Sequence, residues 1–98
     1  MGPSLPIEAG ERKAIPIATG FIDYFPLAIA AVAKLSAAGN EQHNPGAPLH
    51  WDRSKSADED DALMRHFIER HDIGHRTAVA WRAMAGLQKA LEDENGGA

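Results

Sequence analysis

The sequence predicts an all-α protein of three main helices, with a helical hairpin and a long ordered loop between the first two helices. Two observations lead to this prediction. Apolar residues recur at helical spacing in three segments, which span residues 23–38, 56–71 and 75–92, as in amphipathic helices. The alternation of apolar and polar residues at Ile15–Ile17 is too short to indicate a strand.

The chain has 98 residues, no cysteine and a net charge of −4. A chain of this length forms one small domain whose surface is large for its volume, so we expect a homo-oligomer. The lack of cysteine excludes disulfides and thiolate metal sites. The negative charge argues against broad nucleic-acid binding, but it leaves room for a local basic patch that holds a small phosphate ligand.

The sequence also bears on where the protein acts. No stretch approaches the roughly 20 apolar residues that a membrane-spanning helix needs. The N-terminal segment lacks the basic start followed by an apolar run that a secretory signal would have. We therefore expect no membrane partner and a cytoplasmic location.

Residues 1–20 contain three prolines and three glycines. This composition disfavours regular structure and predicts an extended N-terminal arm. The basic residues of the arm, Arg12 and Lys13, are either solvated or reach a ligand or a neighbouring subunit. Residues 21–92 are expected to form a single helical domain, and the acidic, glycine-rich residues 93–98 a flexible tail.

The first helix is expected from Asp23 to Ala38. Pro26 suits its first turn, where the missing N–H costs nothing. Gly39 is a natural stop. The many alanines of this segment allow another helix to approach closely.

The predicted loop spans residues 40–55. Two prolines and a glycine within residues 45–48 break any helix there. Long loops in small domains tend to be functional or disordered. Because Leu49 and Trp51 can dock on the core, the sequence predicts an ordered loop.

The helical hairpin follows the loop. Ser56 and Glu59 have the S-x-x-E spacing of a capping box at the start of the second helix. The third helix is expected to begin at His75 or Arg76 and to end at Glu92. The centre of the hairpin is expected from four large apolar side chains: Leu63, Phe67, Met84 and Leu87.

Two carboxylates are candidate metal ligands. Asp58 and Asp61 are three residues apart, so one helix face would offer both of them to a divalent cation. Oxygen ligands of this kind suit Mg²⁺ or Mn²⁺. The alternative interpretation is an acidic first turn that complements the helix dipole.

Three basic residues are candidate phosphate ligands. Arg53 and Lys55 precede a predicted helix N-terminus, where backbone N–H groups favour anions, and Arg65 lies two turns further on. Carboxylates, a metal and basic side chains together hold polyphosphates in many nucleotide enzymes. The alternative is a set of surface ion pairs, such as Asp61 with Arg65 at i, i+4.

Trp51 and His66 are further candidates. The ring of Trp51 can stack on a base or pack in the core. Histidine in general titrates near neutral pH, so a role of His66 in acid–base chemistry is one hypothesis. His66 can also contact a ligand, or make a hydrogen bond at the edge of the core.

The stretch GNEQHNPGAPLHWDRSKSADEDDALMRH, followed by HRTAVAWRAMAGLQ, resembles a family found mostly in phages and prophages, the dATP/dGTP diphosphohydrolase N-terminal-domain proteins. The resemblance covers residues 11–92. It rests on a helix that ends in Gly39, a loop with Trp51, the D-A-x-x-R-H run at 61–66, and His75 in a later helix. The related MazG-like nucleotide pyrophosphatases bind Mg²⁺ through carboxylate pairs on two helices, and the first helix here offers no such pair.

The resemblance implies Mg²⁺-dependent cleavage of a deoxynucleoside triphosphate to a monophosphate and pyrophosphate, in the cytoplasm of a bacterial host. Two other hypotheses stay open. The same site could bind and sequester a nucleotide, for example a host defence signal, without turnover, or the charged loop could be the interface of a structural or partner-binding phage protein. The roles expected in the enzyme are metal binding by Asp58 and Asp61, catalysis by Asp61 and His66, phosphate binding by Arg53, Lys55 and Arg65, and base stacking by Trp51.

Overall fold

The structure is a computed structural model that describes residues 5–55 and 57–95, apart from the side chains of Lys55 and Asn95. All regular elements in these residues are helical, which confirms the all-α class. The number of helices differs from the prediction, because a short helix precedes the three main ones. The elements in chain order are α1 (Ala9–Lys13), a π-helical turn (Ala18–Ile22), α2 (Pro26–His43), a 3₁₀ turn (Arg53–Lys55), α3 (Glu59–Ile68) and α4 (Ile73–Asn95).

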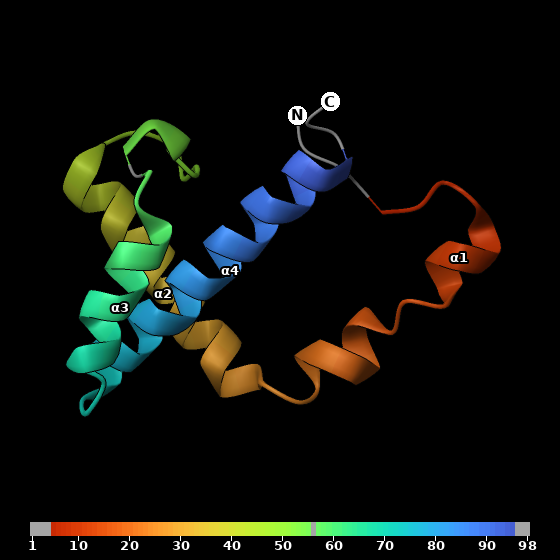
Figure 1. Cartoon of the computed structure of the whole chain (residues 1–98), viewed down its shortest axis with the longest axis horizontal. Coiled ribbons are helices and arrows are strands. Elements are labelled where there is room, and N and C mark those ends of the chain that lie inside the picture. The colour runs from red at the N-terminus through yellow and green to blue at the C-terminus, as the bar shows by residue number, and fades with distance from the viewer. Residues whose placement is uncertain (1–4, 56, 96–98) are drawn as a thin grey trace.

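The long helix α4 is the centre of the fold. The shorter α3 runs alongside it and is joined to it by a tight turn, so the predicted hairpin is present (Figure 1). Helix α2 packs against α4 as well. These two contacts build the helical body, and the N-terminal arm extends away from it (Figure 1).

The buried apolar side chains of α3 and α4 are small. Ala62 is 2% exposed, Ala85 is 5% exposed, and Ala78 is also buried. Alanines let two helix backbones approach closely, because no long side chain holds them apart. The face of α4 that packs against α3 is therefore set by its small residues.

The core predicted from large apolar residues is wrong. Phe67 is 44% exposed and Leu87 is 55% exposed, and Met84 is exposed as well; Leu63 is half-buried. Helical spacing identifies a stripe of apolar residues but does not say which neighbour covers it. Here the alanine faces meet, and the larger side chains lie on outer faces of the hairpin.

Helix α2 does not stop at Gly39, as the sequence suggested, but continues to His43. Among the described glycines, Gly46 has a positive φ, of 80°, and Gly39 does not. Asn44 is the C-cap that follows the helix, and Pro45 after it disfavours helical backbone at this position. The predicted first turn is confirmed, since Pro26 is the first residue of α2.

The other helix ends also moved. Helix α3 begins at Glu59 rather than at Ser56, which lies outside the described residues. Helix α4 starts at Ile73 and is capped by Asp72, whose Oδ1 accepts a 2.8 Å hydrogen bond from the backbone N–H of His75. The described part of the predicted tail, residues 93–95, is the last turn of α4.

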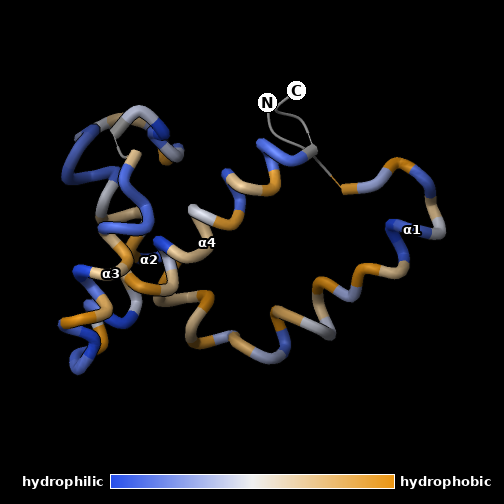
Figure 2. Tube along the Cα trace, in the orientation of Figure 1, coloured by the Kyte–Doolittle hydropathy of each residue, from blue (hydrophilic) through white to orange (hydrophobic). Residues whose placement is uncertain are grey.

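The stretch predicted as an extended arm contains α1 and most of the π-helical turn. Its backbone hydrogen bonds are local, and apolar residues are spread along it (Figure 2). Among the described residues, no single helix is long and apolar enough to cross a membrane. Taken together, the segments Ala9–Ile22 and Pro26–His43 have the length and apolar composition of a membrane span, but the pair is bent by 92°.

Replacing Gly39 with alanine should stabilise the protein. A Cβ at this position would have no neighbour within 4 Å, and alanine in a helix interior is favoured over glycine by about 0.5–1 kcal/mol. Urea denaturation measures the change. Gly46→Ala is the matched control and should destabilise, by about 1–2 kcal/mol, because its positive φ disfavours a side chain. A destabilised Gly39→Ala would mean that α2 ends at Gly39 after all.

A second prediction concerns the buried alanines of α3 and α4. Ala62→Leu should lower the free energy of unfolding by about 1–3 kcal/mol, because it adds volume at the most deeply buried side chain of α3. Ala83→Leu, on the exposed side of α4, should leave the free energy within about 0.5 kcal/mol of wild type. Chemical denaturation of both variants tests this, and equal effects would contradict the assigned face.

Candidate ligand-binding cavity

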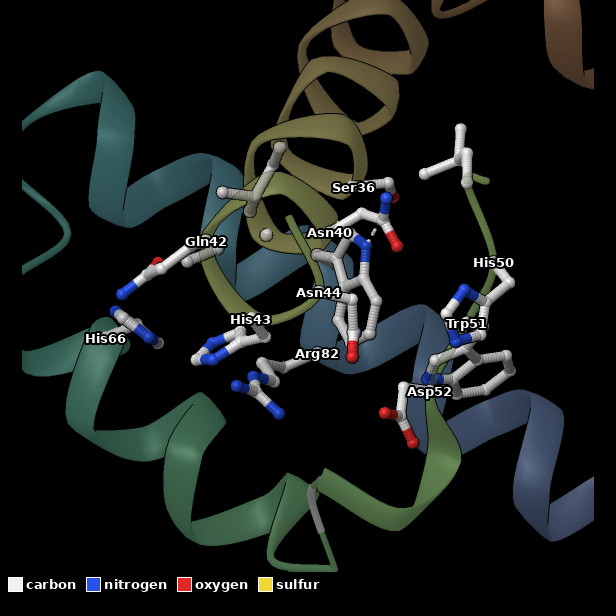
Figure 3. A pocket seen from close by; sticks show the side chains of 15 residues that line it. Ser36, Asn40, Gln42, His43, Asn44, His50, Trp51, Asp52, His66 and Arg82 are labelled. Atoms are coloured by element: carbon white, nitrogen blue, oxygen red, sulfur yellow. Dashed lines mark hydrogen bonds between the residues drawn. The ribbon is translucent and has the colours of Figure 1, made fainter. Parts of the chain in front are cut away.

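A cavity of about 470 Å³ lies between the C-terminal part of α2, the loop that follows it, and the facing sides of α3 and α4 (Figure 3). Its volume falls within the range of small-molecule sites, about 300–1,000 Å³. Its lining combines two tryptophans with amide, imidazole and guanidinium groups. A wall of this mixed kind suits a ligand with both a flat apolar part and polar groups.

The aromatic part of the wall is Trp51 against Trp81. Their ring centroids are 5.9 Å apart and the rings are nearly perpendicular, at 83°, which is a favourable edge-to-face arrangement. The indole N–H of Trp81 donates a 2.7 Å hydrogen bond to the hydroxyl of Ser36 on α2. This bond fixes Trp81, and Trp81 in turn positions the loop residue Trp51.

Asn40 connects the loop to α2. Its Nδ2 donates a 3.0 Å hydrogen bond to the backbone carbonyl of Ala47, which holds the chain reversal at residues 44–47 against the helix. Its Oδ1 is buried and has no hydrogen-bond partner within the part of the chain that the structure describes. Gln42 and Asn44 bring two more amide side chains to the same cavity.

Arg82 is the cationic group of the lining, and a buried carboxylate holds it. Glu59 is 8% exposed and accepts hydrogen bonds from Arg82 at 2.9 Å and from Lys89 at 2.8 Å. Burial by itself would raise the pKa of Glu59. The hydrogen bonds from Lys89 and Arg82, together with their charges, outweigh it and lower that pKa below its usual value of 4.5.

Two histidines meet beside the cavity. The Nδ1 atoms of His66 and His75 are 3.0 Å apart, a hydrogen bond that needs one donor and one acceptor nitrogen. The Nε2 atom of His75 lies 3.8 Å from Glu69 and 3.9 Å from Asp72. His75 therefore lies next to these two carboxylates, whereas His66 lines the cavity.

The structure brings two of the predicted site residues to this cavity, Trp51 and His66. Arg53 is not part of its lining. The Arg53 guanidinium binds Glu92 at 2.8 Å and stacks over the ring of Trp51, 4.1 Å from its centroid. The side chain of Lys55 lies outside the described part of the structure.

The remaining predicted residues lie outside the cavity. Arg65 forms a 3.0 Å ion pair with Asp58, and both side chains are more than half exposed. This pair replaces the i, i+4 pair with Asp61, which is exposed. Across residues 5–55 and 57–95, no group of three or more histidine, aspartate or glutamate side chains is arranged to hold a metal ion.

Several lining residues escaped the sequence reasoning, namely Asn40, Gln42, His43, Asn44 and Arg82. The first four were expected in a loop, because Gly39 suggested a helix end. In the structure they extend α2 by one turn and cap it, and this turn forms one side of the cavity. The run of polar residues before Pro45 was the available signal.

Comparison with known proteins finds no family model that matches this chain, and no solved structure that matches it. The chain is similar to a part of HyfR of Escherichia coli (strain K12), described as a DNA-binding transcriptional activator. The two are 38% identical over 55 residues, which is 54% of this chain and 8% of HyfR. This chain therefore spans a small part of the length of that protein.

The buried carboxylate makes a pH-dependent prediction. Glu59→Gln should lower the free energy of unfolding at neutral pH by about 1–3 kcal/mol, as expected when hydrogen bonds to a charged group are lost. Because the folded-state pKa is lowered, the stabilisation is complete above 4.5 and is lost as the pH falls through that lowered pKa. The gap between variant and wild type should therefore shrink below pH 4.5.

Urea titrations of both proteins at neutral and acidic pH measure that gap. Asp60→Asn is the matched control, because Asp60 is the exposed neighbour of Glu59 and should change stability little. A gap that is constant down to the acid limit would show that the ion pairs of Glu59 do not stabilise the fold.

Proposed function

We propose that this protein binds a nucleotide in the cavity between α2 and α4. The observation that carries the proposal is the combination of an aromatic corner, amide side chains and a fixed guanidinium around one space of nucleotide size. A nucleotide has the matching parts, since its base is flat and hydrogen-bonding and its phosphates are anionic.

The base is assigned to the side of the cavity that holds Trp51. Aromatic side chains contribute about 1–3 kcal/mol per base when a base stacks on them, and Trp51 is partly exposed at the edge of the cavity. Asn44 supplies an amide group between the two sides of the cavity (Figure 3), and an amide can both donate and accept hydrogen bonds. This pairing of donor and acceptor is what the edge of a base requires.

The phosphates are assigned to the side that holds Arg82. In Figure 3, Arg82 and His43 point toward the same region of the cavity, and His66 lies beyond His43. A guanidinium has five N–H donors in a planar fork, so Arg82 can bind an anion while it stays bonded to Glu59. The imidazoles of His43 and His66 can add ring N–H donors to this side of the cavity.

Binding, rather than metal-dependent hydrolysis, is the function that the geometry supports. The carboxylates expected to hold Mg²⁺ or Mn²⁺, Asp58 and Asp61, are not among the lining residues. The one carboxylate in the lining is Asp52, whose Oδ1 accepts hydrogen bonds from the backbone N–H and the hydroxyl of Ser54. The function that we propose is therefore nucleotide capture, as in a sequestering protein.

DNA binding is the second candidate, because HyfR is a DNA-binding protein. The similarity to HyfR covers a small part of that protein, and the net charge of −4 disfavours attraction to a polyanion. A DNA duplex therefore serves as a comparison ligand in the test below.

Calorimetry with a panel of ribo- and deoxynucleotides, with and without Mg²⁺, tests the proposal. We expect Trp51→Ala and His43→Ala to weaken binding of the best ligand at least about tenfold, which corresponds to about 1.4 kcal/mol. Arg65→Ala and Asp61→Asn should leave the affinity unchanged, because both residues lie outside the cavity. Pyrophosphate release measured in the same samples reports turnover.

The opposite pattern would locate the site at the start of α3, as the resemblance implies. In that case Asp61→Asn and Arg65→Ala would abolish binding and turnover, whereas the cavity variants would bind normally. Tight binding of the DNA duplex and none of the nucleotides would favour the second candidate. No binding to any ligand of the panel would refute the proposal.

A further inference from the structure

This chain exposes much more surface than a compact protein of its mass. Its accessible surface is 7506 Å², whereas a folded monomer of 10.5 kDa has about 5,400 Å². The excess is about 2,100 Å² by that scaling. Stable dimers with large interfaces bury about 1,000–2,500 Å² on each partner, so the excess equals the surface that one copy would lose in such a dimer.

The N-terminal arm contributes to this excess surface, because its described residues are almost all exposed. The radius of gyration is 15.1 Å, against about 12.6 Å for a compact domain of this length. The helix pairs in extensive contact are α3 with α4 and α2 with α4, and the arm belongs to neither. Residues 5–25 therefore lie apart from the body, as Figure 1 shows.

The large apolar side chains of the arm are exposed. Every leucine, isoleucine, phenylalanine and tyrosine between residues 5 and 27 is exposed, with Ile7 at 94% and Leu27 at 86%. Contiguous apolar patches on soluble monomers rarely exceed a few hundred Å². So many exposed apolar side chains in one segment indicate that another protein surface covers the arm.

The chain also carries a surface that such an arm fits. Met84, Leu87 and Leu91 recur at helical spacing along the C-terminal half of α4, and all three are exposed. Because they are three and four residues apart, they form one stripe on one face of the helix. The buried alanines Ala78 and Ala85 lie on another face of α4, so this stripe is part of the surface of the single chain.

We propose that this protein is a homodimer in which the arm of each copy, residues 5–27, docks on the α4 stripe (Met84, Leu87 and Leu91) of the other. Such a contact is self-complementary, since each copy offers one arm and one stripe, and it closes at two copies. The charges fit an arm that runs antiparallel to α4. The basic end of α1, Arg12 and Lys13, would then lie near the acidic residues Asp93 and Glu94.

A second copy explains the arm better than a lipid surface does. Segments that lie on anionic membranes are rich in lysine and arginine, whereas residues 5–27 carry two basic and three acidic residues. The π-helical turn and α1 are five residues each; Pro16 lies between them, and residues 23–25 separate the π-helical turn from α2, which begins at Pro26. A continuous amphipathic helix, as membrane surfaces bind, is thus absent from residues 5–25.

Light scattering and sedimentation velocity at micromolar concentration test the assembly, independently of any nucleotide. Wild type should have twice the mass of the 10.5 kDa chain. Ile22→Asp in the arm and Leu87→Asp in the stripe should each raise the dissociation constant of the dimer at least about tenfold. Both residues are exposed in the single chain, and circular dichroism verifies that the variants fold. Ile68→Asp is the matched control, because Ile68 is an exposed apolar residue at the end of α3, outside both the arm and the stripe.

Disulfide trapping tests which surfaces meet. Because the chain has no cysteine, each introduced thiol is the single thiol of its chain. A mixture of Ile22→Cys and Leu87→Cys proteins should form a disulfide between unlike chains under mild oxidation. Ile22→Cys mixed with Arg76→Cys, at the opposite end of α4, should form far less of it.

Three results would overturn the proposal. A monomeric wild type at micromolar concentration would mean that the arm does not join two copies. A dimer unaffected by Ile22→Asp and Leu87→Asp would place the interface elsewhere. A monomer that sediments with vesicles of phosphatidylcholine and phosphatidylglycerol would show that lipid, rather than a second copy, covers the arm.

Discussion

The buried carboxylate of Glu59 is the interaction on which the rest of the body depends. A charged group that is 8% exposed is tolerated only when it is paired and hydrogen-bonded. Glu59 meets this requirement through Arg82 and Lys89, which lie about two turns apart on α4. These three side chains fix the position of the start of α3 along the axis of α4. Gly86 lies opposite Glu59, where an added Cβ would come within 3.9 Å of the Glu59 Cβ, so the two helices are close at this level.

The cavity follows from that arrangement. With α3 held against the alanine face of α4, Arg82 is directed to the space that α2 closes from the other side. Helix α2 is fixed by the hydrogen bond between Trp81 and Ser36, and the loop is fixed by Asn40. One buried ion-pair network and two single hydrogen bonds therefore define the walls, and polar side chains between them determine what the cavity can bind.

The arm and the body are stabilised by different kinds of contact. The body is stabilised by its own long-range contacts, whereas the arm has local hydrogen bonds and uncovered apolar side chains. Such a segment gains little from the hydrophobic effect in a single chain. For this reason the assembly that we propose and the cavity depend on different parts of the sequence, and each can change without the other.

The sequence by itself determined the helical class, the first turn of α2 at Pro26 and the pairing of α3 with α4, because helical periodicity and proline geometry are local properties.

Only the tertiary structure decided which faces meet. Phe67 and Leu87 were the natural core by hydropathy, yet alanines pack closer and left both exposed. Gly39 was read as a helix end, yet contacts of Ser36 and Asn40 on either side of it extend α2. Glu59 resembled a capping residue, and its role as a buried ion-pair centre depends on Arg82 and Lys89, which are 23 and 30 residues away. Contacts across such separations leave no periodic signal, so local pattern could not reveal them.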